Sequence, residues 1–379
     1  MRITVVNGFF LPVPPVAGGA TEKSWFRLAA EFAARGHEVV SISRRWPGCA
    51  DEETAGGLRH LRLPGADHHR SLRRNLLRDL RWSLRVYRRL PPADIVVCNA
   101  VTLPVWLGRL KPAAGRVVVM CGRMPKGQYR RYTALARVLA PSGTVRDRIL
   151  RENPALGDRI RVTGYPIDWS LFHAAARTAA PAVALGYVGR LHEEKGLLLL
   201  VEALRRLQAV PGLPPWQFTL GGPADVAAGG SGPAFRARLL QLLAAGLPPD
   251  RWRMVDPEFN EPALAARYRA LDVFCYPSLA AQGETFGVAV AEAMAAGAVP
   301  VVSGLDCFRE FVRDEQNGLQ FAHEDPDAAG RLAGALARLV RDAALRSRLA
   351  AAAREDVRRY DYPAFAERLL EDFAELAHG

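Results

Sequence analysis

Two acidic residues, Glu284 and Glu292, lie eight positions apart in the otherwise apolar stretch 282–297. If the whole stretch were helical, both carboxylates would fall near one face, because eight residues make slightly more than two turns. Gly283 and Gly287 suggest that Glu284 lies in the turn entering the helix. A buried unpaired carboxylate is costly, and the hydroxyls of a polyhydroxylated ligand would supply the missing donors. The alternative is an amphipathic helix with two solvent-facing acids.

Two cations, Arg190 and Lys195, stand between a strand-like apolar run and an amphipathic helix. Cationic side chains that converge with a helix N-terminus suit a diphosphate ligand. Lys195 is one of only four lysines in a chain that otherwise uses arginine. The alternative is that Glu193 and Glu194 pair with both cations at the surface.

Gly18 and Gly19 follow the first strand-like run and enter a helical segment. Glycines at such a position let backbone N–H groups approach an anion, which the helix N-terminus also favours. The spacing is not Gly-x-Gly-x-x-Gly, so a dinucleotide is not indicated. A flexible connection between strand and helix is the alternative.

In their order along the chain, these segments resemble those of the retaining, metal-independent GT-B glycosyltransferases, the group 1 family related to glycogen and sucrose synthases. The resemblance implies that Arg190 and Lys195 bind the donor diphosphate and stabilise charge on the leaving nucleotide. It places Glu284 beside the donor sugar and Glu292 at the ribose hydroxyls. The other donor-binding positions that it implies are Gly18, Gly19, Gly189, and the backbone N–H groups of Phe286 and Gly287.

One segment departs from the family pattern. The family often has a His after the fourth strand of the first domain, whereas here residues 116–120 lead into Cys121, Gly122 and Arg123. Arg123, together with Lys126, is a candidate replacement that would face an anionic acceptor; the alternative is a pair of solvated loop cations. The missing His also keeps open a nucleotide-sugar-binding protein without turnover.

No metal or cofactor is expected, and a nucleotide-diphosphate sugar would be the co-substrate. Asp325 and Asp327 have the Asp-x-Asp spacing of a metal signature, but they lie in a polar turn before a helix, where acids usually act as caps. A hexosamine 2-epimerase shares the expected fold, but the two cations and two acids together favour transfer.

Positive charge is concentrated in the first half of the chain. Residues 1–170 contain 29 Lys and Arg against 13 Asp and Glu, and the remainder has a net charge of −4. The segment 68–90 has eight arginines, one acid and leucines at helical spacing. It could lie on an anionic membrane surface, or its apolar stripe could pack on the sheet. An interleaved aromatic platform for nucleic acid is lacking, so no nucleic-acid partner is expected.

Short apolar runs alternate with amphipathic segments, which predicts an α/β protein with parallel sheets and helices on both faces. We expect a GT-B architecture of two Rossmann-like domains with a cleft between them: an acceptor-side domain over 1–170 and a donor domain over 171–356. The boundary falls in the Ala-, Arg- and Pro-rich stretch 174–181. The family resemblance implies that the last helix, in 357–379, crosses back to the first domain. The runs predicted as strands are 3–6, 39–43, 95–98, 117–120, 138–140, 185–188, 218–220, 273–276 and 299–302.

The sequence predicts a cytoplasmic protein that could also lie peripherally on the inner face of the cell membrane. Met1 leads directly into a strand-like run without a signal-peptide pattern. The longest apolar runs fall far short of the ~20 residues that span a bilayer. Five widely spaced cysteines are expected to be reduced core thiols. The resemblance further implies a glycan or polyprenyl-diphosphate-linked acceptor in bacterial surface-polysaccharide biosynthesis.

Overall fold

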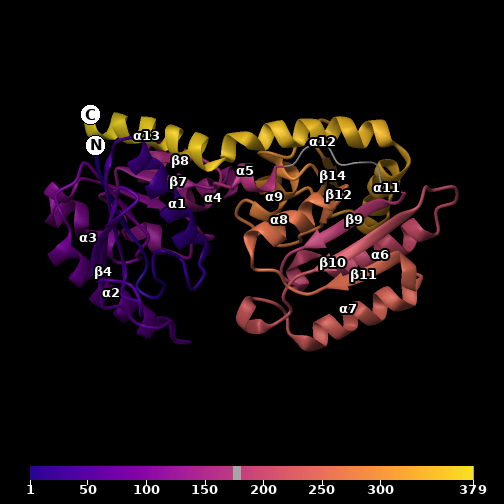
Figure 1. The fold of residues 1–379 in the computed structure, drawn as a ribbon, viewed down its shortest axis with the longest axis horizontal. Helices are drawn as coiled ribbons and strands as arrows, with labels where there is room; N and C mark the ends of the chain where they lie inside the picture. The colour runs from indigo at the N-terminus through magenta and orange to yellow at the C-terminus, as the bar shows by residue number, and fades with distance from the viewer. Residues whose placement is uncertain (174–180, 379) are drawn as a thin grey trace. The chain divides into compact units, whose positions relative to one another are not determined.

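A computed structural model describes residues 1–173 and 181–378, and it divides the chain into two α/β units (Figure 1). Unit 1 comprises Met1–Pro166 and the C-terminal segment from Tyr362 onward, and unit 2 comprises Ile167–Asp361. The predicted class, two Rossmann-like units with largely parallel sheets, is confirmed. We expected the boundary in the stretch 174–181, of which residues 174–180 lie outside the described residues; the division between the units falls instead between Pro166 and Ile167.

Unit 1 is built on an eight-stranded sheet in the order β3-β4-β2-β1-β5-β6-β7-β8. Every neighbouring pair is parallel except β3 and β4, which form an antiparallel hairpin at one edge. The strands are β1 (Arg2–Val6), β2 (Glu38–Arg44), β3 (Glu52–Ala55), β4 (Leu58–Leu63), β5 (Ile95–Cys98), β6 (Arg116–Met120), β7 (Arg137–Ala140) and β8 (Ile160–Val162).

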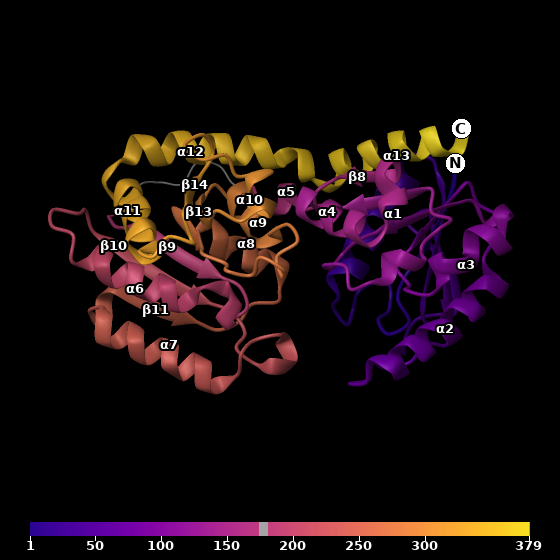
Figure 2. The same ribbon diagram turned by 180° about the vertical axis from the view of Figure 1, so that it is seen from behind.

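The helices of unit 1 cover both faces of this sheet, as Figure 2 shows from behind. Trp82, Leu103 and Leu107, from α2 and α3, share one buried cluster with strand residues such as Val96. On α1 and α13, Phe32 and Phe373 meet at 6.0 Å between ring centroids. The helices are α1 (Ala20–Ala34), α2 (Leu72–Arg89), α3 (Leu103–Leu110), α4 (Gly143–Glu152) and α13 (Tyr362–His378).

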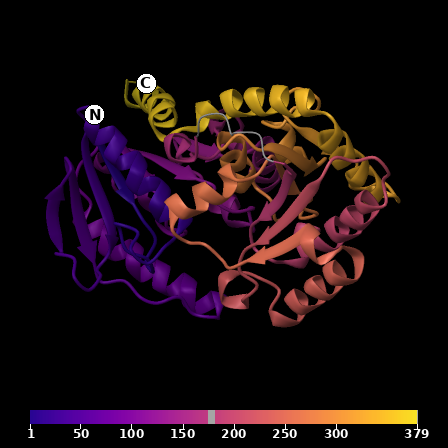
Figure 3. The same cartoon turned by 45° about the vertical axis from the view of Figure 1, so that its right-hand side comes forward.

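Unit 2 contains a fully parallel six-stranded sheet in the order β11-β10-β9-β12-β13-β14. Its strands are β9 (Val183–Val188), β10 (Trp216–Gly221), β11 (Trp252–Val255), β12 (Val273–Tyr276), β13 (Val299–Ser303) and β14 (Leu319–Phe321). In Figure 3, α6 and α7 lie along one side of this sheet. The helices are α5 (Trp169–Phe172), α6 (Leu197–Gln208), α7 (Pro233–Gly246), α8 (Glu261–Arg269), α9 (Val288–Ala295), α10 (Asp306–Arg309), α11 (Ala328–Arg341) and α12 (Ala343–Val357).

Each sheet reverses its strand order at one point, and this point positions the candidate residues. In unit 1 the reversal lies at β1, which pairs with β2 on one side and β5 on the other. In unit 2 it lies at β9, between β10 and β12. Loops at the carboxyl ends of strands beside such a reversal form the ligand-binding crevice of open α/β sheets. The loops after β1, β9 and β12 carry the Gly-Gly pair, Lys195 and Glu284 respectively.

Helix α2 turns its leucines outward, so the alternative in which the leucine stripe packs on the sheet is wrong. The exposed leucines are Leu72, Leu76, Leu77, Leu80 and Leu84, between 40% and 71% accessible. The helix is held to unit 1 mainly by other side chains. Trp82 donates its indole N–H to the Asn7 carbonyl at 3.0 Å, and Asp79 accepts the backbone N–H of Thr102 at 2.7 Å.

All five cysteines are reduced, as predicted, and Cys98, Cys121, Cys275 and Cys307 are buried. Burial raises the pKa of the Cys121 thiol to about 11, which keeps it protonated at neutral pH. Cys49 differs from the prediction because it is half-buried in a bend after β2. Within the described residues, no helix combines the length and apolar character needed to cross a membrane.

Candidate active site

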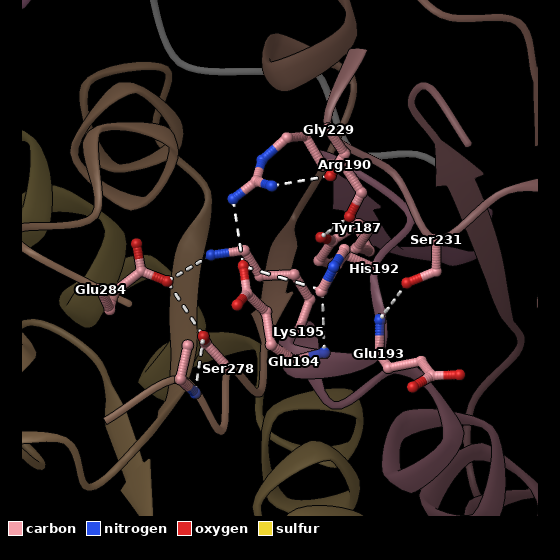
Figure 4. Close-up of polar contacts among 11 residues, drawn as sticks. Tyr187, Arg190, His192, Glu193, Glu194, Lys195, Gly229, Ser231, Ser278 and Glu284 are labelled. Carbon is pink, nitrogen blue, oxygen red and sulfur yellow. Dashed lines mark hydrogen bonds and ion pairs between the residues drawn. The ribbon is translucent and has the colours of Figure 1, made fainter. Parts of the chain in front are cut away.

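A buried ion pair links Lys195 to Glu284 at the carboxyl edge of the sheet in unit 2. The Lys195 Nζ lies 2.6 Å from Oε2 of Glu284, and the same oxygen accepts the Ser278 hydroxyl at 2.9 Å (Figure 4). Lys195 is 4% exposed and Glu284 is 8% exposed. The ammonium also lies 5.4 Å from the ring centroid of Tyr276, at the end of β12. Each charge is therefore compensated by a donor or acceptor in contact with it.

The backbone brings these side chains together although 89 positions separate them. Lys195 ends a short 3-10 turn (Glu193–Lys195), and Gly196 follows with φ of 67°. A Cβ on Gly196 would lie 2.0 Å from the Pro277 carbonyl oxygen, so only glycine fits this close approach. A hydrogen bond of 2.8 Å from the Leu279 N–H to the Glu194 carbonyl joins the same two loops.

Arg190 lies at the more open side of this cluster. Its guanidinium donates to the Gly229 carbonyl at 2.7 Å and to Oε1 of Glu194 at 3.2 Å (Figure 4). Its side chain is 44% exposed. The alternative of local pairing is thus correct for Arg190 and Glu194, whereas Lys195 pairs with Glu284 instead.

The two acids of the opening motif occupy different kinds of structure. Glu284 precedes the helix, as Gly283 and Gly287 suggested, since α9 begins only at Val288. Glu292 is half-buried on α9, and its charge contributes to raising the pKa of the buried Tyr268 after desolvation, the larger cause. The two carboxylates therefore do not share a helix face.

The backbone between these acids is fixed by aromatic packing. Phe286 is buried and stacks on Phe311, with 4.6 Å between ring centroids. Gly287 caps the start of α9. At the end of β9, Gly189 donates its N–H to the Gly221 carbonyl at 3.0 Å, which joins the loops after β9 and β10.

The remaining predicted residues belong to unit 1. Gly18 and Gly19 precede α1, with Gly19 as the N-cap residue. Arg123 is exposed in the loop after β6, and its positive charge lowers the pKa of Glu22 on α1, which burial raises by a larger amount. Lys126 is also exposed, and its backbone N–H donates to the Gln128 side chain at 2.7 Å. Arg123 thus lies near a buried acid that the sequence analysis did not single out.

Comparison with known families separates the chain into two matched regions. Residues 17–170 match the model described as Glycosyltransferase Family 4, and residues 182–342 match Glycosyl transferases group 1. Residues 182–342 therefore form a region of the Glycosyl transferases group 1 type, and residues 17–170 a region of the Glycosyltransferase Family 4 type. The first region lies within unit 2, and all but the last four residues of the second lie within unit 1.

Curated relatives resemble this chain over part of their length. A phosphatidyl-myo-inositol mannosyltransferase of Mycobacterium tuberculosis is 33% identical over 50% of this chain and 47% of its own. A D-inositol 3-phosphate glycosyltransferase of Xylanimonas cellulosilytica is 32% identical over 58% of this chain and 52% of its own. The match therefore spans about half the length of these relatives.

Solved structures share the fold of this protein over nearly the whole chain. A sucrose-phosphate synthase from Thermosynechococcus elongatus has a TM-score of 0.76 at 22% identity and covers 99% of both chains. Anabaena HepE, in complex with UDP and glucose, has a TM-score of 0.70 at 16% identity, covering 99% of this chain and 100% of its own. The GT-B fold is thus confirmed.

Two members of the site, Ser278 and Tyr276, were not predicted from the sequence, although both contact the ion pair. The signal was available in the position of Ser278, which lies two residues after the buried strand β12 and precedes Glu284 by six residues. Side chains at the carboxyl end of a parallel strand face the ligand crevice.

The two aspartates with metal-like spacing, Asp325 and Asp327, contact protein groups. Asp325 accepts the Asp327 N–H at 2.8 Å and the Arg331 Nε at 2.9 Å. Asp327 precedes α11 and pairs with Arg206. Asp327 occupies the N-cap position without a side-chain cap hydrogen bond, so the predicted capping role fits its place but not its side-chain contact.

Proposed function

We propose that this glycosyltransferase moves a sugar from a nucleoside-diphosphate donor to a glycan or lipid-linked acceptor, with retention of anomeric configuration and without a metal ion. The observation that carries the proposal is the convergence of Arg190, Lys195 and Glu284 at one edge of the sheet in unit 2. The UDP and glucose held by the Anabaena neighbour support a nucleotide-sugar donor.

The two cations suit the leaving group of such a reaction. When the bond between the anomeric carbon and the phosphate oxygen breaks, negative charge accumulates on the nucleoside diphosphate. Lys195 is held in place by Glu284 and Ser278 before any ligand arrives, so little reorganisation is needed. The exposed fork of Arg190 can exchange its contacts with Gly229 and Glu194 for phosphate oxygens.

The two acids suit the other parts of the donor. A carboxylate beside the anomeric carbon stabilises the positive character that develops there, which is the role that we propose for Glu284. Its second oxygen would accept a hydrogen bond from a sugar hydroxyl. Glu292, on α9, would accept hydrogen bonds from the ribose. The acceptor hydroxyl then replaces the nucleoside diphosphate at the anomeric carbon.

Calorimetric titration with UDP, GDP and ADP, without metal, tests the donor site. We expect one nucleotide to bind wild type, and Glu292→Ala to weaken that binding about tenfold, because a hydrogen-bonded pair is lost. Glu202→Ala is the matched control, since Glu202 pairs with Arg205 and Arg206 on α6 and has no part in the proposed site. Failure of all three nucleotides to bind, even with magnesium, would overturn the donor assignment.

A second candidate is a protein that binds nucleotide sugars without turnover. It is favoured by the loop after β6, where Arg123 stands in place of the family's histidine. Incubation with the nucleotide sugar that matches the bound nucleotide separates the two. Release of free nucleotide, through transfer or slow hydrolysis, supports the enzyme, whereas tight binding with no release over hours supports the second candidate.

We further propose that the acceptor is presented at an anionic membrane surface in bacterial surface-polysaccharide assembly. The support is α2, whose outward leucines and surrounding arginines combine apolar insertion with attraction to anionic lipid. The location would then be cytoplasmic, with peripheral attachment to the inner face of the membrane.

Sedimentation with liposomes of stated composition tests this surface. We expect wild type to bind phosphatidylglycerol-containing vesicles at low salt, and a variant with Leu76→Glu and Leu80→Glu to lose most of that binding. Leu242→Glu on α7 is the matched control, because Leu242 is 40% exposed, as are Leu76 and Leu80. Equal binding by wild type and the α2 variant would contradict the proposal.

A further inference from the structure

A groove with a volume of about 780 Å³ lies at the amino edge of the sheet in unit 1. It runs along the segments that enter β5, β6, β7 and β8, and α3 and the end of α13 border it. Small-molecule sites have volumes of roughly 300–1,000 Å³. The substrate crevice of such sheets forms at the opposite, carboxyl edge, and the five residues of β6 put roughly 15 Å between the two edges. The groove is therefore separate from the proposed reaction.

Two arginines on the groove carry charge that the protein does not compensate. Arg116, which begins β6, donates from Nε to the Leu376 carbonyl at 3.2 Å. Arg159, just before β8, donates from Nη1 to the Leu135 carbonyl at 3.0 Å. Both side chains are exposed, and neither pairs with a carboxylate in the part of the chain that the structure describes. Most of the five N–H groups of each guanidinium are thus available to a ligand.

The segment between these two arginines offers further donors to the groove. The backbone N–H groups of Thr133, Ala134 and Leu135 have no acceptor within residues 1–173 and 181–378. Backbone N–H groups in folded proteins are almost always paired, with protein or with water. Hydrogen bonds from backbone N–H and guanidinium groups to an oxyanion are charge-assisted and stronger than those to water. The groove therefore favours an anion over solvent.

The two carboxylates on the groove differ in how far the protein compensates them. Asp94 accepts hydrogen bonds from the Arg2 backbone N–H at 2.8 Å and from the Arg2 guanidinium at 2.9 Å. The backbone bond is the larger cause of the lowered pKa of Asp94. Glu375, on α13, is 70% exposed and lies 3.9 Å from the nearest Arg137 nitrogen, beyond hydrogen-bond distance. Glu375 is therefore the lining charge that most opposes an anion.

The two arginines also have structural roles. A cation beside the last carbonyl groups of α13 stabilises that helix, which is a role for Arg116. The contact from Arg159 holds the turn before β7. Each role uses one N–H group and needs no groove. Neither role accounts for two uncompensated cations that line the same hollow, whereas an anionic ligand accounts for both.

We propose that this amino-edge groove binds a small molecule that carries two or more phosphate groups, with Arg116 and Arg159 each binding one of them. β7 lies between β6 and β8, so the backbones of the two arginines are roughly 10 Å apart. Two linked phosphate groups match this separation better than a single phosphate does. A guanidinium binds each phosphate through two parallel N–H groups. The site takes no part in the proposed transfer, so its ligand is an effector and not a substrate.

Calorimetric titration of the full chain with inorganic tripolyphosphate, diphosphate and monophosphate tests the groove. We expect tripolyphosphate to bind wild type about tenfold more tightly than monophosphate, and Arg116→Ala and Arg159→Ala each to weaken tripolyphosphate about tenfold. Arg151→Ala is the matched control, because Arg151 is exposed on α4 and does not line the groove. Wild-type affinity in both groove variants would overturn the proposal.

Glu375→Gln gives a change in the opposite direction. Removing the opposing charge should strengthen tripolyphosphate binding about threefold, without the loss of any donor. Glu367→Gln is the control, since Glu367 is exposed on the same helix and does not line the groove. Equal affinities in the two glutamine variants would contradict the placement of the ligand beside the end of α13.

The remaining outcomes separate the groove from the proposed donor site and from general charge. Binding that disappears with Arg190→Ala alone would assign tripolyphosphate to the donor site and overturn the groove, whereas binding that persists there supports it. Equal weakening by Arg151→Ala would mean that the ion responds only to net charge, which also overturns the proposal. Arg116→Lys keeps the charge and loses the fork. Weaker binding in this variant at a wild-type unfolding temperature excludes the loss of α13 packing as the cause.

Discussion

Glu284 and Glu22 are both buried carboxylates at the carboxyl edge of a parallel sheet, yet their surroundings differ. Glu284 contacts an ammonium at 2.6 Å and a hydroxyl at 2.9 Å. The Glu22 carboxylate accepts a hydrogen bond from its own backbone N–H, and the charge of Arg123 lowers its pKa without a hydrogen bond. In unit 2 the protein places an opposite charge in direct contact with the carboxylate, whereas in unit 1 the cation acts on the carboxylate only through its charge. Two carboxylates of similar burial can therefore differ in role because their partners differ.

Removing the ammonium is expected to give the largest effect and to make Glu284 resemble Glu22. Lys195→Met leaves the Glu284 carboxylate buried without its cation, which should cost about 3–5 kcal/mol in the free energy of unfolding. Transfer should fall at least ~100-fold, because charge on the leaving nucleotide is no longer neutralised. Urea unfolding and donor turnover measure the two losses.

A double variant separates the two consequences. Lys195→Met combined with Glu284→Gln removes both charges and should recover most of the lost stability while transfer stays low. Unchanged stability in the single variant would show that the ion pair does not hold the two loops together.

Substitution of Gly196 tests whether the close approach of two loops brings Lys195 to Glu284. Gly196→Ala should destabilise unit 2 by about 1–3 kcal/mol, because the added methyl meets the Pro277 carbonyl and φ is positive. Gly212→Ala has a similar positive φ but nothing within 4 Å, so it is the control for backbone strain alone. Equal unfolding free energies in the two variants would mean that the close approach contributes nothing.

Substitution of Arg190 tests whether the exposed side of the proposed donor site binds the nucleotide. Arg190→Lys keeps the charge but loses the planar fork, and we expect nucleotide affinity to fall about tenfold, or about 1.4 kcal/mol. Stability should be unchanged, since the side chain is 44% exposed. A titration of the nucleotide that binds wild type measures the change; an affinity equal to wild type would remove Arg190 from the site.

The smallest expected effect concerns the stability of unit 1. The folded-state pKa of Glu22 is raised above 4.5 by burial, so its ionised form destabilises the fold, and that cost disappears as pH falls below the unfolded-state value. Glu22→Gln should therefore unfold at a higher temperature than wild type at pH 7, with a difference that shrinks towards pH 4. Calorimetric scans at both pH values measure it. A lower unfolding temperature at pH 7 would assign Glu22 to helix capping.

The sequence predicts the strands that are buried on both faces, because they are continuous apolar runs. β1, β5 and β12 are examples. It does not predict the short or polar strands near the edges. β3 is exposed throughout, and β4 carries Arg59, His60 and Arg62 among its leucines. The Ala55-Gly56-Gly57-Leu58 turn between them was a usable hairpin signal.

The contacts within the candidate site could not be predicted from the sequence. Lys195 pairs with Glu284, 89 positions away, and not with a neighbouring acid. Sequence periodicity carries no information on such pairs. The direction of α2 was equally inaccessible, because a leucine stripe looks the same whether it faces a sheet or solvent. Its attachment through Trp82 and Asp79 decides the matter.

Helix α13 lies at the end of the sequence but belongs to the unit that begins it. Phe373 packs against Phe32, and Asp372 accepts a hydrogen bond from the Arg137 guanidinium at 2.9 Å. Unit 2, by contrast, is one continuous segment, Ile167–Asp361. During synthesis on the ribosome, all residues of unit 2 therefore emerge before α13, so unit 2 can fold while unit 1 still lacks that helix. Unit 1 begins to emerge first but can complete its fold only after unit 2 has been synthesised.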